Sequence, residues 1–456
     1  MPNHRMLSRR DMLKLLGATG ASVVALAACA PTVPTPGVGE EAAAPGEQER
    51  IELRYMDRGD ALGEFMRHAS RVYEEQNPHI VVKNESTGWG DLTTKVPTFV
   101  AAGTMADLAF QHNAFMLPEL AKKGAWLNVE PLAEADGHDF AIYYPFAVDA
   151  LRLGPQDELI AMPMGIHFGE NDVMWNVEML QEFGLPEPSA EMSLDEFEEL
   201  LILVQEKMPE GGFAADFSKE FWGMEAHSRS FGGYIISNDR TQCGFDLPET
   251  RDAHQWMIDL IHQHQVVPSR DKVLESGKSM FYTGMLAIIS NTAPNVWVGF
   301  QQATEGRFTL GHTVWPHGDG GKVGITPSVD ATVIYAQTKY PDEAWGLAKL
   351  LSSFEISKWA AMHENHMTPG AVIEAWHDPE VWEVNPPYKN LALFWDTLTP
   401  EDAGSVPVPA NTRKGEFWDL YNNEWTALRE GDKPFDEANI SKLDADLQAI
   451  MDKPVP

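Results

Sequence analysis

A chain of 456 residues with 43% hydrophobic side chains is long enough for two lobes with separate cores, since single cores stop growing at about 250–300 residues. Its 34 basic residues stand against 68 acidic ones, and the net charge of −34 argues against a nucleic-acid partner and, less strongly, against a polyanionic ligand. Charge alone does not show whether the acidic surface serves a function of this kind, simple solubility or adaptation to a salty habitat.

Cysteine use limits the chemistry that the chain can carry. Cys29 and Cys243 are the two cysteines of the sequence. If Cys29 is modified, as the next paragraphs argue, Cys243 has no partner for an internal disulfide, and packing stabilises the folded body. A solitary cysteine is more often a small buried hydrophobe than a nucleophile.

The first residues have the pattern of a bacterial export signal. Ser8-Arg9-Arg10-Asp11-Met12 resembles the twin-arginine signal, although methionine stands where phenylalanine is usual. The apolar run from Leu15 to Ala28 is shorter than the roughly 20 residues that a helix needs to span a bilayer. We therefore expect residues 1–28 to be a cleaved export signal that depends on Arg9 and Arg10.

The apolar run ends in Leu26-Ala27-Ala28-Cys29, which resembles a lipobox, the cleavage signal of bacterial lipoproteins. The alternative is a short core helix with an unrelated cysteine. Acyl chains on Cys29 would hold the protein at the outer face of the cytoplasmic membrane. Residues 29–50, rich in Pro, Gly, Ala and Glu, are expected to be a tether. Loss of residues 1–28 removes four basic residues and one acidic residue, which leaves a net charge of −37.

Strands and helices alternate over the first part of the folded body. Alternating apolar residues predict strands, and apolar residues three or four apart predict helices. The expected elements are strands at Ile51–Met56, His79–Lys83 and Asp107–Phe110, and helices at Ala61–Gln76 and Asp91–Ala102, the second closed by Gly103. Such alternation indicates a layered α/β sheet with parallel strands.

The rest of the body continues the pattern. Ser193 with Glu196 three residues later forms a capping box and predicts a helix that runs to about Met208. The later strands are expected at Glu158–Pro163, Asp172–Asn176, Phe308–Val314 and Ala331–Ala336. The later helices are expected at Asp342–Leu351, Phe354–Met362, Glu416–Glu430 and Glu437–Met451.

Several short motifs, in a shared order and spacing, resemble the family 1 extracellular solute-binding proteins of ABC importers, the group that contains maltose-binding protein. The motifs are a helix ending in Glu75-Gln76-Asn77-Pro78, the turn Ala102-Gly103-Thr104-Met105-Ala106-Asp107, the crossover Met162-Pro163-Met164-Gly165 with Trp175-Asn176 and Phe183-Gly184-Leu185-Pro186, the segment Phe281–Ile288 with Asn291–Trp297, and the helix Ala344–Phe354. Ala106 stands where the family usually has proline. The resemblance covers nearly the whole chain after the signal.

The resemblance implies a two-lobed α/β periplasmic-binding-protein fold with a ligand cleft between hinged lobes. By the resemblance, lobe one comprises residues 50–167 and 320–351, and lobe two comprises residues 168–319 and 352–456. It also implies that the protein captures a sugar or oligosaccharide and delivers it to an ABC permease. We expect a monomer that touches the membrane only through its lipid.

A sugar site needs flat aromatic walls for the apolar ring faces and polar groups for the hydroxyls. The chain has 14 Trp, most of which are expected in cores. By the resemblance, Trp297 and Trp418 align with sugar-stacking Trp residues of the maltose-binding relatives. Trp89 and the pair Phe231 and Tyr234 lie in Gly-rich loops, and open α/β sheets bind ligands at loops that follow strands.

Polar candidates follow the first strands of the body. Asp57 and Arg58 come after the first strand, and Gln111 and Asn113 come after the third. His167 lies in the crossover, where relatives place a polar sugar contact. For each of these residues the alternative is a solvated loop or a helix cap.

Three other functions remain as alternatives. A secreted glycoside hydrolase would need two carboxylates that face each other, and the sequence lacks the G-x-S-x-G, H-E-x-x-H and phosphate-loop motifs of other enzymes. A metal-binding protein would need three or four ligands, but only the pairs His363 with His366 and His262 with His264 occur at close spacing. We expect neither catalysis, nor a cofactor, nor a metal.

The third alternative keeps the fold and changes the ligand to a polyamine, a peptide or glycerol phosphate. A phosphate ligand needs clustered Arg or Lys residues or a free helix N-terminus. Among the candidates near the expected cleft, only Arg58 and Arg413 supply such a charge.

Overall fold

The computed structural model describes residues 50–60, 62–115, 117–167, 172–272, 277–290, 297–318, 324–363, 368–385, 387–398 and 407–455. The side chains of residues 277, 297–299, 301, 387 and 397 also lie outside the description. The predictions for Arg9, Arg10 and Cys29 fall outside the described residues, as do His366 and the side chain of Trp297. Within the described part, no helix combines the length and the apolar character needed to cross a membrane.

The first of two sheets has five strands in the order β2-β1-β3-β9-β4. The strands are β1 (Ile51–Met56), β2 (Ile80–Asn84), β3 (Leu108–His112), β4 (Met162–His167) and β9 (Ser328–Ile334). β1 pairs in parallel with β2 and β3, whereas β9 runs antiparallel to both β3 and β4. The expected parallel sheet is therefore a mixed sheet, because β9 enters from the other half of the chain in the reverse direction.

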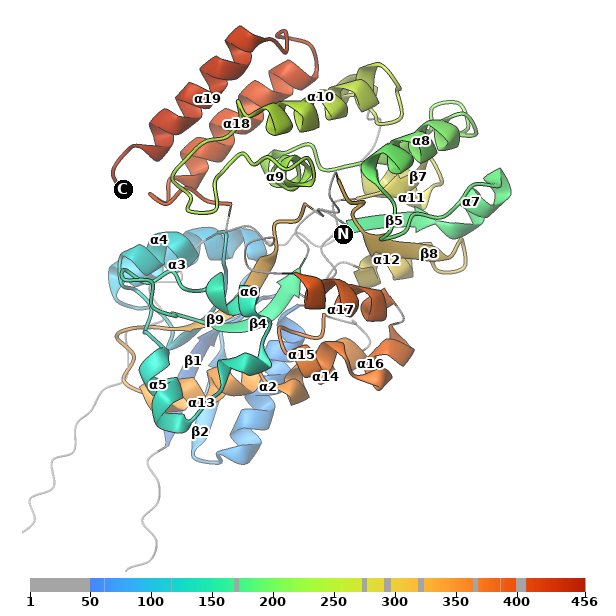
Figure 1. Cartoon of the computed structure of the whole chain (residues 1–456). Helices are drawn as coiled ribbons and strands as arrows, with labels where there is room; N and C mark the ends of the chain where they lie inside the picture. Colours follow the sequence, from blue (N-terminus) through green and yellow to red (C-terminus); the bar gives the residue numbers. More distant parts are fainter. Residues whose placement is uncertain are drawn as a thin grey trace, which may run out of the picture. The chain divides into compact units, whose positions relative to one another are not determined.

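The second sheet has four strands in the order β6-β7-β5-β8. The strands are β5 (Asp172–Asn176), β6 (Phe213–Asp216), β7 (Leu286–Ile289) and β8 (Leu310–Val314). Only β6 and β7 pair in parallel among these described strands, and β5 runs antiparallel to both of its neighbours. Figure 1 shows β5, β7 and β8 in one group and β1, β2, β4 and β9 in another.

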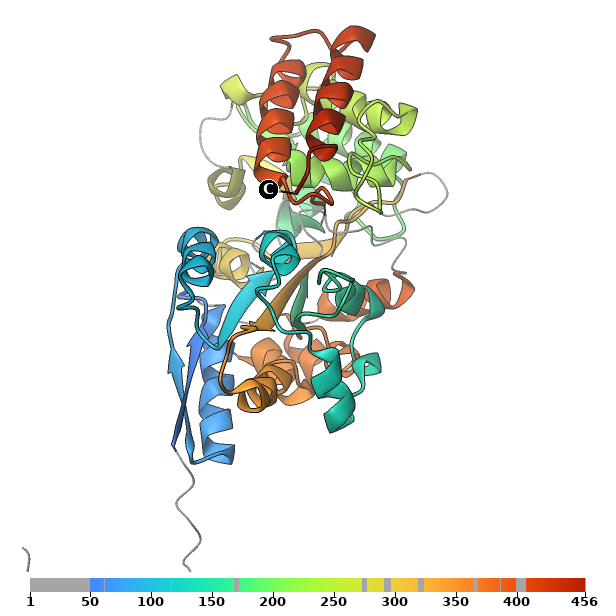
Figure 2. The ribbon, with the colours of Figure 1, turned by 90° about the vertical axis from the view of Figure 1, so that its left-hand side faces the viewer.

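Helices cover both sheets. The first sheet is accompanied by α2 (Gly63–Gln76), α3 (Trp89–Ala102), α4 (Leu117–Lys122), α5 (Glu130–Asp136), α6 (Pro145–Asp149), α13 (Pro341–Leu351), α14 (Phe354–Met362), α15 (Ile373–Trp376), α16 (Pro379–Val384), α17 (Pro387–Thr397) and a 3-10 turn at Phe140–Ile142. α2 and α13 contact each other, and they also contact β2 and β9 respectively (Figure 2).

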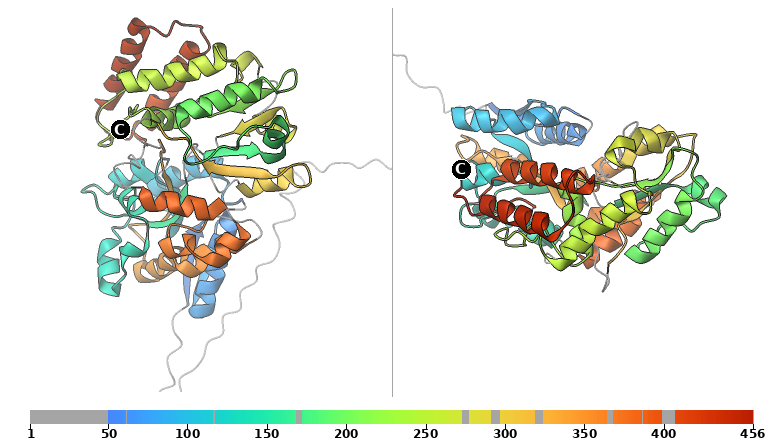
Figure 3. Two further views of the ribbon diagram at one scale, coloured as in Figure 1. Left: turned by 45° about the vertical axis from the view of Figure 1, so that its right-hand side comes forward. Right: turned by 90° about the horizontal axis from the view of Figure 1, so that it is seen from above.

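The second sheet is accompanied by α7 (Val177–Phe183), α8 (Leu194–Gln205), α9 (Phe221–Ser230), α10 (Pro248–His262), α11 (Gly277–Tyr282), α12 (Trp297–Thr304), α18 (Lys414–Arg429), α19 (Glu437–Met451) and a 3-10 turn at Arg270–Lys272. α18 lies side by side with α19 and also contacts α9 and α10 (Figure 3). The capping box of Ser193 and Glu196 at the start of α8 is confirmed, and so is the left-handed Gly103 that closes α3.

Most predicted elements agree with the structure to within three residues, and one differs. The strand expected at Glu158–Pro163 begins at Met162 and continues to His167. Residues Leu159 and Ile160 are fully buried all the same. Burial without sheet pairing explains why an apolar run alone misplaced this strand.

Two large apolar cores accompany the two sheets. The first core includes residues of β1 to β4 and β9, and it also includes Ile356, Trp376 and Trp395 from the segment after residue 352. The second core includes residues of β5 to β7 together with Phe417 and Trp425. The segment that holds α14 to α17 therefore packs with the first core, in contrast to the expected assignment of residues 352–456 to lobe two.

We accordingly propose that lobe one comprises residues 50–167 and 324–398, and that lobe two comprises residues 172–318 and 407–455. α17 also contacts β8 and lies at the boundary. The two lobes are named in this sense below. The segments that join them, 168–171, 319–323 and 399–406, are outside the described residues.

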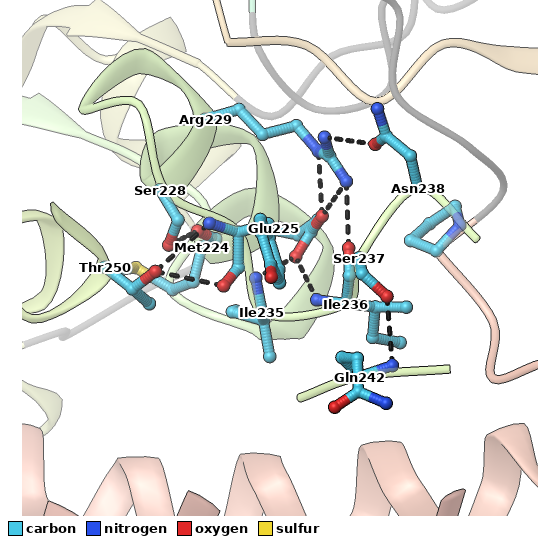
Figure 4. A network of polar contacts seen from close by, with 12 residues as sticks. Met224, Glu225, Ser228, Arg229, Ile235, Ile236, Ser237, Asn238, Gln242 and Thr250 are labelled. Atoms are coloured by element: carbon cyan, nitrogen blue, oxygen red, sulfur yellow. Dashed lines mark hydrogen bonds and ion pairs between the residues drawn. The ribbon is translucent and has the colours of Figure 1, made fainter. Parts of the chain in front are cut away.

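A buried carboxylate anchors the loop that follows α9. One oxygen of Glu225 pairs with the Arg229 guanidinium, and the other accepts the backbone N–H groups of Ile235 and Ile236 at 2.6 and 3.1 Å (Figure 4). Glu225 is fully buried. Arg229 also donates to the Ile236 carbonyl and to the Asn238 side chain. This network holds the loop from Phe231 to Gly244 against lobe two.

The Glu225→Gln substitution should destabilise lobe two, because the amide leaves Arg229 without its charge partner in a buried place. Removing one partner of a buried pair costs about 3–5 kcal/mol. The check is the free energy of unfolding from urea titration. The control Glu437→Gln, in an exposed pair with Arg251, should cost less than about 1 kcal/mol. Equal effects of the two substitutions would show that the network contributes little.

Candidate functional site

Polar side chains gather where three strands of lobe one end. Asp57 and Arg58 follow β1, Gln111 lies near the end of β3 with Asn113 just after it, and His167 is the last residue of β4. Asp57, Gln111 and Asn113 are fully buried, and His167 is nearly so. The sheet thus brings together all five polar residues that the sequence predicted in this part of the chain.

Four of these five side chains, all except Gln111, have a polar partner among the described residues. Asp57 accepts from the Arg67 guanidinium at 3.0 Å, and Arg58 is paired with Asp60. The Asn113 side-chain oxygen accepts the Val329 N–H, which ties the end of β3 to β9. His167 Nε2 lies 2.8 Å from a carboxylate oxygen of Asp330, a residue of β9 that sequence reasoning did not identify.

Burial sets the ionisation of this polar group. It raises the pKa of Asp57, against hydrogen bonds from Ser86 and Arg67 that lower it. Burial also acts to raise the pKa of Asp330, but the charge of His167 and its hydrogen bond outweigh this effect, so the net pKa is lowered. His112 has its pKa lowered to about 3 by burial, and its Nδ1 accepts the Ala114 N–H, as a neutral imidazole does.

Some polar atoms of the group have no hydrogen-bond partner among the described residues. They include both side-chain polar atoms of Gln111, the amide nitrogen of Asn113 and one carboxylate oxygen of Asp330. Buried polar groups in proteins are nearly always hydrogen-bonded, so unmatched ones call for a specific explanation. A polar ligand would supply partners for them.

A set of rings, here called the aromatic cluster, joins lobe one to lobe two. It consists of Trp89, His112 and Phe115 from lobe one and Trp222 and Trp418 from lobe two. Phe115 and Trp222 are stacked at 5.9 Å with an angle of 6° between their planes. Trp418 meets Phe115 and Trp222 edge-on at 5.9 and 5.6 Å.

Local structure explains why these rings meet. Trp89 begins α3 directly after the β2 loop, and Phe115 is held in a turn by the bond from its N–H to the His112 carbonyl. Trp222 lies in the first turn of α9, and the backbone carbonyl of Lys219, two residues before that helix, accepts from Trp425 and Arg429 of α18. α18 therefore fixes both Trp222 and its own Trp418.

Two cations border the aromatic cluster. The Arg58 guanidinium lies 4.9 Å from the Trp89 ring centre and 5.3 Å from that of Phe110. The Lys414 ammonium lies 4.0 Å from the Phe115 ring centre and 4.9 Å from that of Trp418. Burial lowers the pKa of Lys414 to about 8.

Two cavities lie away from the aromatic cluster. One of about 10 Å³ lies beside His167 and Asp330, between the first sheet and α14, and has room for about one water molecule. The other, of about 400 Å³, is a surface groove beside α8. The first cavity is lined by His167 but is too small for a sugar, and none of the ten ligand-binding residues predicted from the sequence lines the groove beside α8. Neither cavity is therefore our candidate for the ligand site.

The remaining predicted residues divide into two groups. Trp418 is in the aromatic cluster, as is Trp89. Phe231 instead contacts Trp256 of the second core, and Tyr234 packs against Gly244 and Thr250 in the loop held by Glu225. The ring contact of Phe231 is with Trp256 and not with a ring of the aromatic cluster. Their roles in ligand binding, like that of Trp297, remain predictions.

Sequence reasoning missed Phe115, Trp222, Asp330 and Lys414. A signal was present for Lys414, because it precedes Trp418 by four residues and such residues share one face of a helix. No comparable signal marked Trp222 or Phe115, whose partners come from distant parts of the chain.

A model of the family described as bacterial extracellular solute-binding protein matches residues 57–355 of this chain. That match spans well over half of the sequence and includes residues of both sheets.

Solved structures share the fold. An ABC substrate-binding protein from Listeria monocytogenes in complex with cycloalternan is similar with a TM-score of 0.72 at 18% identity, covering 88% of this chain and 99% of that one. UgpB from Mycobacterium tuberculosis with glycerophosphocholine has a TM-score of 0.73 at 16% identity, covering 89% and 99%. The sugar-binding protein MalE from Xanthomonas citri has 0.72 at 17% identity, covering 88% and 97%.

Proposed function

Because the chain belongs to the bacterial extracellular solute-binding protein family, we propose that it captures a sugar or oligosaccharide between its lobes and delivers it to the permease of an ABC importer. The observation that carries this proposal is the aromatic cluster, in which rings of both lobes meet beside buried polar groups. The ligand leaves the protein chemically unaltered.

The composition of the site suits a saccharide. Indole and phenyl rings offer flat apolar surfaces for the C–H faces of a sugar, at a small cost in conformational entropy. Gln111 and Asn113 offer both donors and acceptors for hydroxyl groups. The amides lie at the end of β3 and the rings lie at the lobe contact. Open α/β sheets bind ligands where their strands end.

Ligand binding would exchange contacts between rings for contacts with the ligand. Phe115 and Trp222 stack on each other in this structure, so a sugar must part them before it binds between the lobes. A ligand that touches both lobes favours the arrangement in which both can reach it. This coupling lets a permease distinguish the loaded protein from the empty one.

We further propose that the protein is an exported lipoprotein. The arginine pair Arg9 and Arg10, the short apolar run and Cys29 occur in the order that export and lipidation require. Residues 29–50 then separate the folded body from the membrane as a tether.

The Trp418→Ala substitution should weaken sugar binding about thirtyfold, or about 2 kcal/mol, because it removes a ring that faces lobe one. Calorimetry on the full chain carrying Cys29→Ala measures the affinity, and unfolding without ligand measures stability separately. Trp359→Ala is the matched control, since Trp359 stacks on His68 and His363 outside the aromatic cluster. An unchanged affinity together with a lowered melting temperature would place Trp418 in a purely structural role.

The Cys29→Ala substitution should move the protein from the membrane fraction to the soluble fraction or leave an unprocessed precursor, because no thiol is left to carry a lipid. Fractionation and immunoblotting of cells provide the measurement. Cys243→Ala is the control and should leave the membrane association intact. A fully processed Cys29→Ala protein that still sediments with membranes would refute the lipid anchor.

A further inference from the structure

Lys414 is the first residue of α18 and borders the aromatic cluster. Its ammonium faces Phe115 of lobe one at 4.0 Å and Trp418 of lobe two at 4.9 Å. A group that touches rings from both lobes is placed where a ligand between the lobes would lie. This lysine was not among the residues predicted from the sequence.

Lys414 lacks a carboxylate partner within 4.0 Å among the described residues, although the chain has twice as many acidic as basic residues. Other lysines of the body do have such partners, for example Lys358 with Asp378, Lys433 with Glu424 and Lys442 with Asp446. The acidic group that acts on Lys414 is Glu119, whose Coulomb attraction opposes the lowering of the Lys414 pKa by burial.

The other charges near the aromatic cluster are already matched. Arg58 pairs with Asp60, Asp57 pairs with Arg67, and Asp330 lies against His167. His112 is neutral, since its pKa is lowered to about 3. Lys414 is therefore the one unmatched charge among these described groups of the site.

An unmatched ammonium in this position is electrostatically unfavourable. Burial strips part of its water and lowers its pKa to about 8, and the rings replace that water only in part. The N-terminal end of α18, a helix of 16 residues, carries a partial positive charge that repels it further. An anion between the lobes would relieve both effects.

We propose that Lys414 determines specificity by binding an anionic group of the ligand, so that the preferred ligand is an acidic sugar. This inference rests on the proposed function and refines its ligand class. A carboxylate and a phosphate monoester both have the required charge, and each would accept a hydrogen bond from the ammonium. Arg58, on the opposite border of the cluster, adds a second positive group.

The negative charge of the whole chain does not prevent this recognition. Surface charges are screened over about 8 Å at physiological ionic strength, whereas a buried contact is screened much less. The acidic surface therefore slows the approach of polyanions, and the local ammonium decides how a single anionic group binds.

The test uses matched sets of ligands with the full chain carrying Cys29→Ala. Each set is a neutral hexose, its uronate and its 6-phosphate, for glucose, galactose and mannose. Thermal shift selects the set that binds, and calorimetry measures its affinities at pH 7. We expect one of the acidic members to bind at least tenfold more tightly than the neutral sugar. The tighter acidic member identifies the group as carboxylate or phosphate.

Variants connect this preference to the ammonium. Lys414→Met should abolish the preference, since methionine keeps most of the apolar stem but carries no charge. In the unaltered protein the preference should decline as the pH rises above about 8, where free Lys414 loses its proton. Lys414→Arg should keep the preference without that decline, because guanidinium stays charged. Lys433→Met is the matched control and should change neither property.

The outcomes separate the inference from the function on which it rests. Equal binding of neutral and acidic members, or a preference that survives Lys414→Met, overturns the role of Lys414 and leaves sugar binding in place. Absence of binding by every member of the three sets overturns the assignment to a hexose or its acidic derivatives, and the inference with it.

Discussion

The stacked pair of Phe115 and Trp222 is the contact on which the proposed site depends. It joins a turn at the end of β3 in lobe one to the first turn of α9 in lobe two. Trp89, His112 and Trp418 gather around it. Rings can keep such a contact or give it up to a ligand of similar shape, because stacking with a neighbouring ring and with a sugar face use the same apolar surface.

The polar groups beneath the rings add a constraint of a different kind. Gln111 is fully buried with both side-chain polar atoms unmatched among the described residues. Leaving a buried donor or acceptor unmatched costs about 1–3 kcal/mol. A ligand that supplies these hydrogen bonds recovers part of that cost, so the site favours polar ligands with apolar faces over purely apolar ones. We propose that the ammonium of Lys414 narrows the class of preferred ligands further, to acidic sugars.

The sequence was a good guide to position wherever polar residues follow strands. The gathering of Asp57, Arg58, Gln111, Asn113 and His167 could be predicted, because the ends of neighbouring strands meet at one edge of a sheet, and their part in ligand binding stays a prediction. It was a poor guide wherever two distant elements meet. Phe115 in its turn and Trp222 in its helix become candidates only through their stacked contact, and they are more than a hundred residues apart in the sequence.

The assignment of α14 to α17 to a lobe was difficult for the same reason, because it depends on contacts between distant parts of the chain. Ile356, Trp376 and Trp395 are as apolar as residues of either core, and only the folded structure decides which sheet they cover. Helix caps were easier to predict, since Ser193 and Glu196 satisfy each other within a few residues. Local hydrogen bonds can thus be predicted from the sequence, whereas the lobe to which a helix belongs cannot.

The most direct test of this account is a crystal structure of the protein with its bound ligand. We predict that the ligand lies between the lobes, with one face against Trp418 or Trp222 and the other against Phe115 or Trp89, and that it bonds to Gln111. The stacked contact of Phe115 with Trp222 should then be open. A ligand bound elsewhere, with that contact intact, would contradict the account.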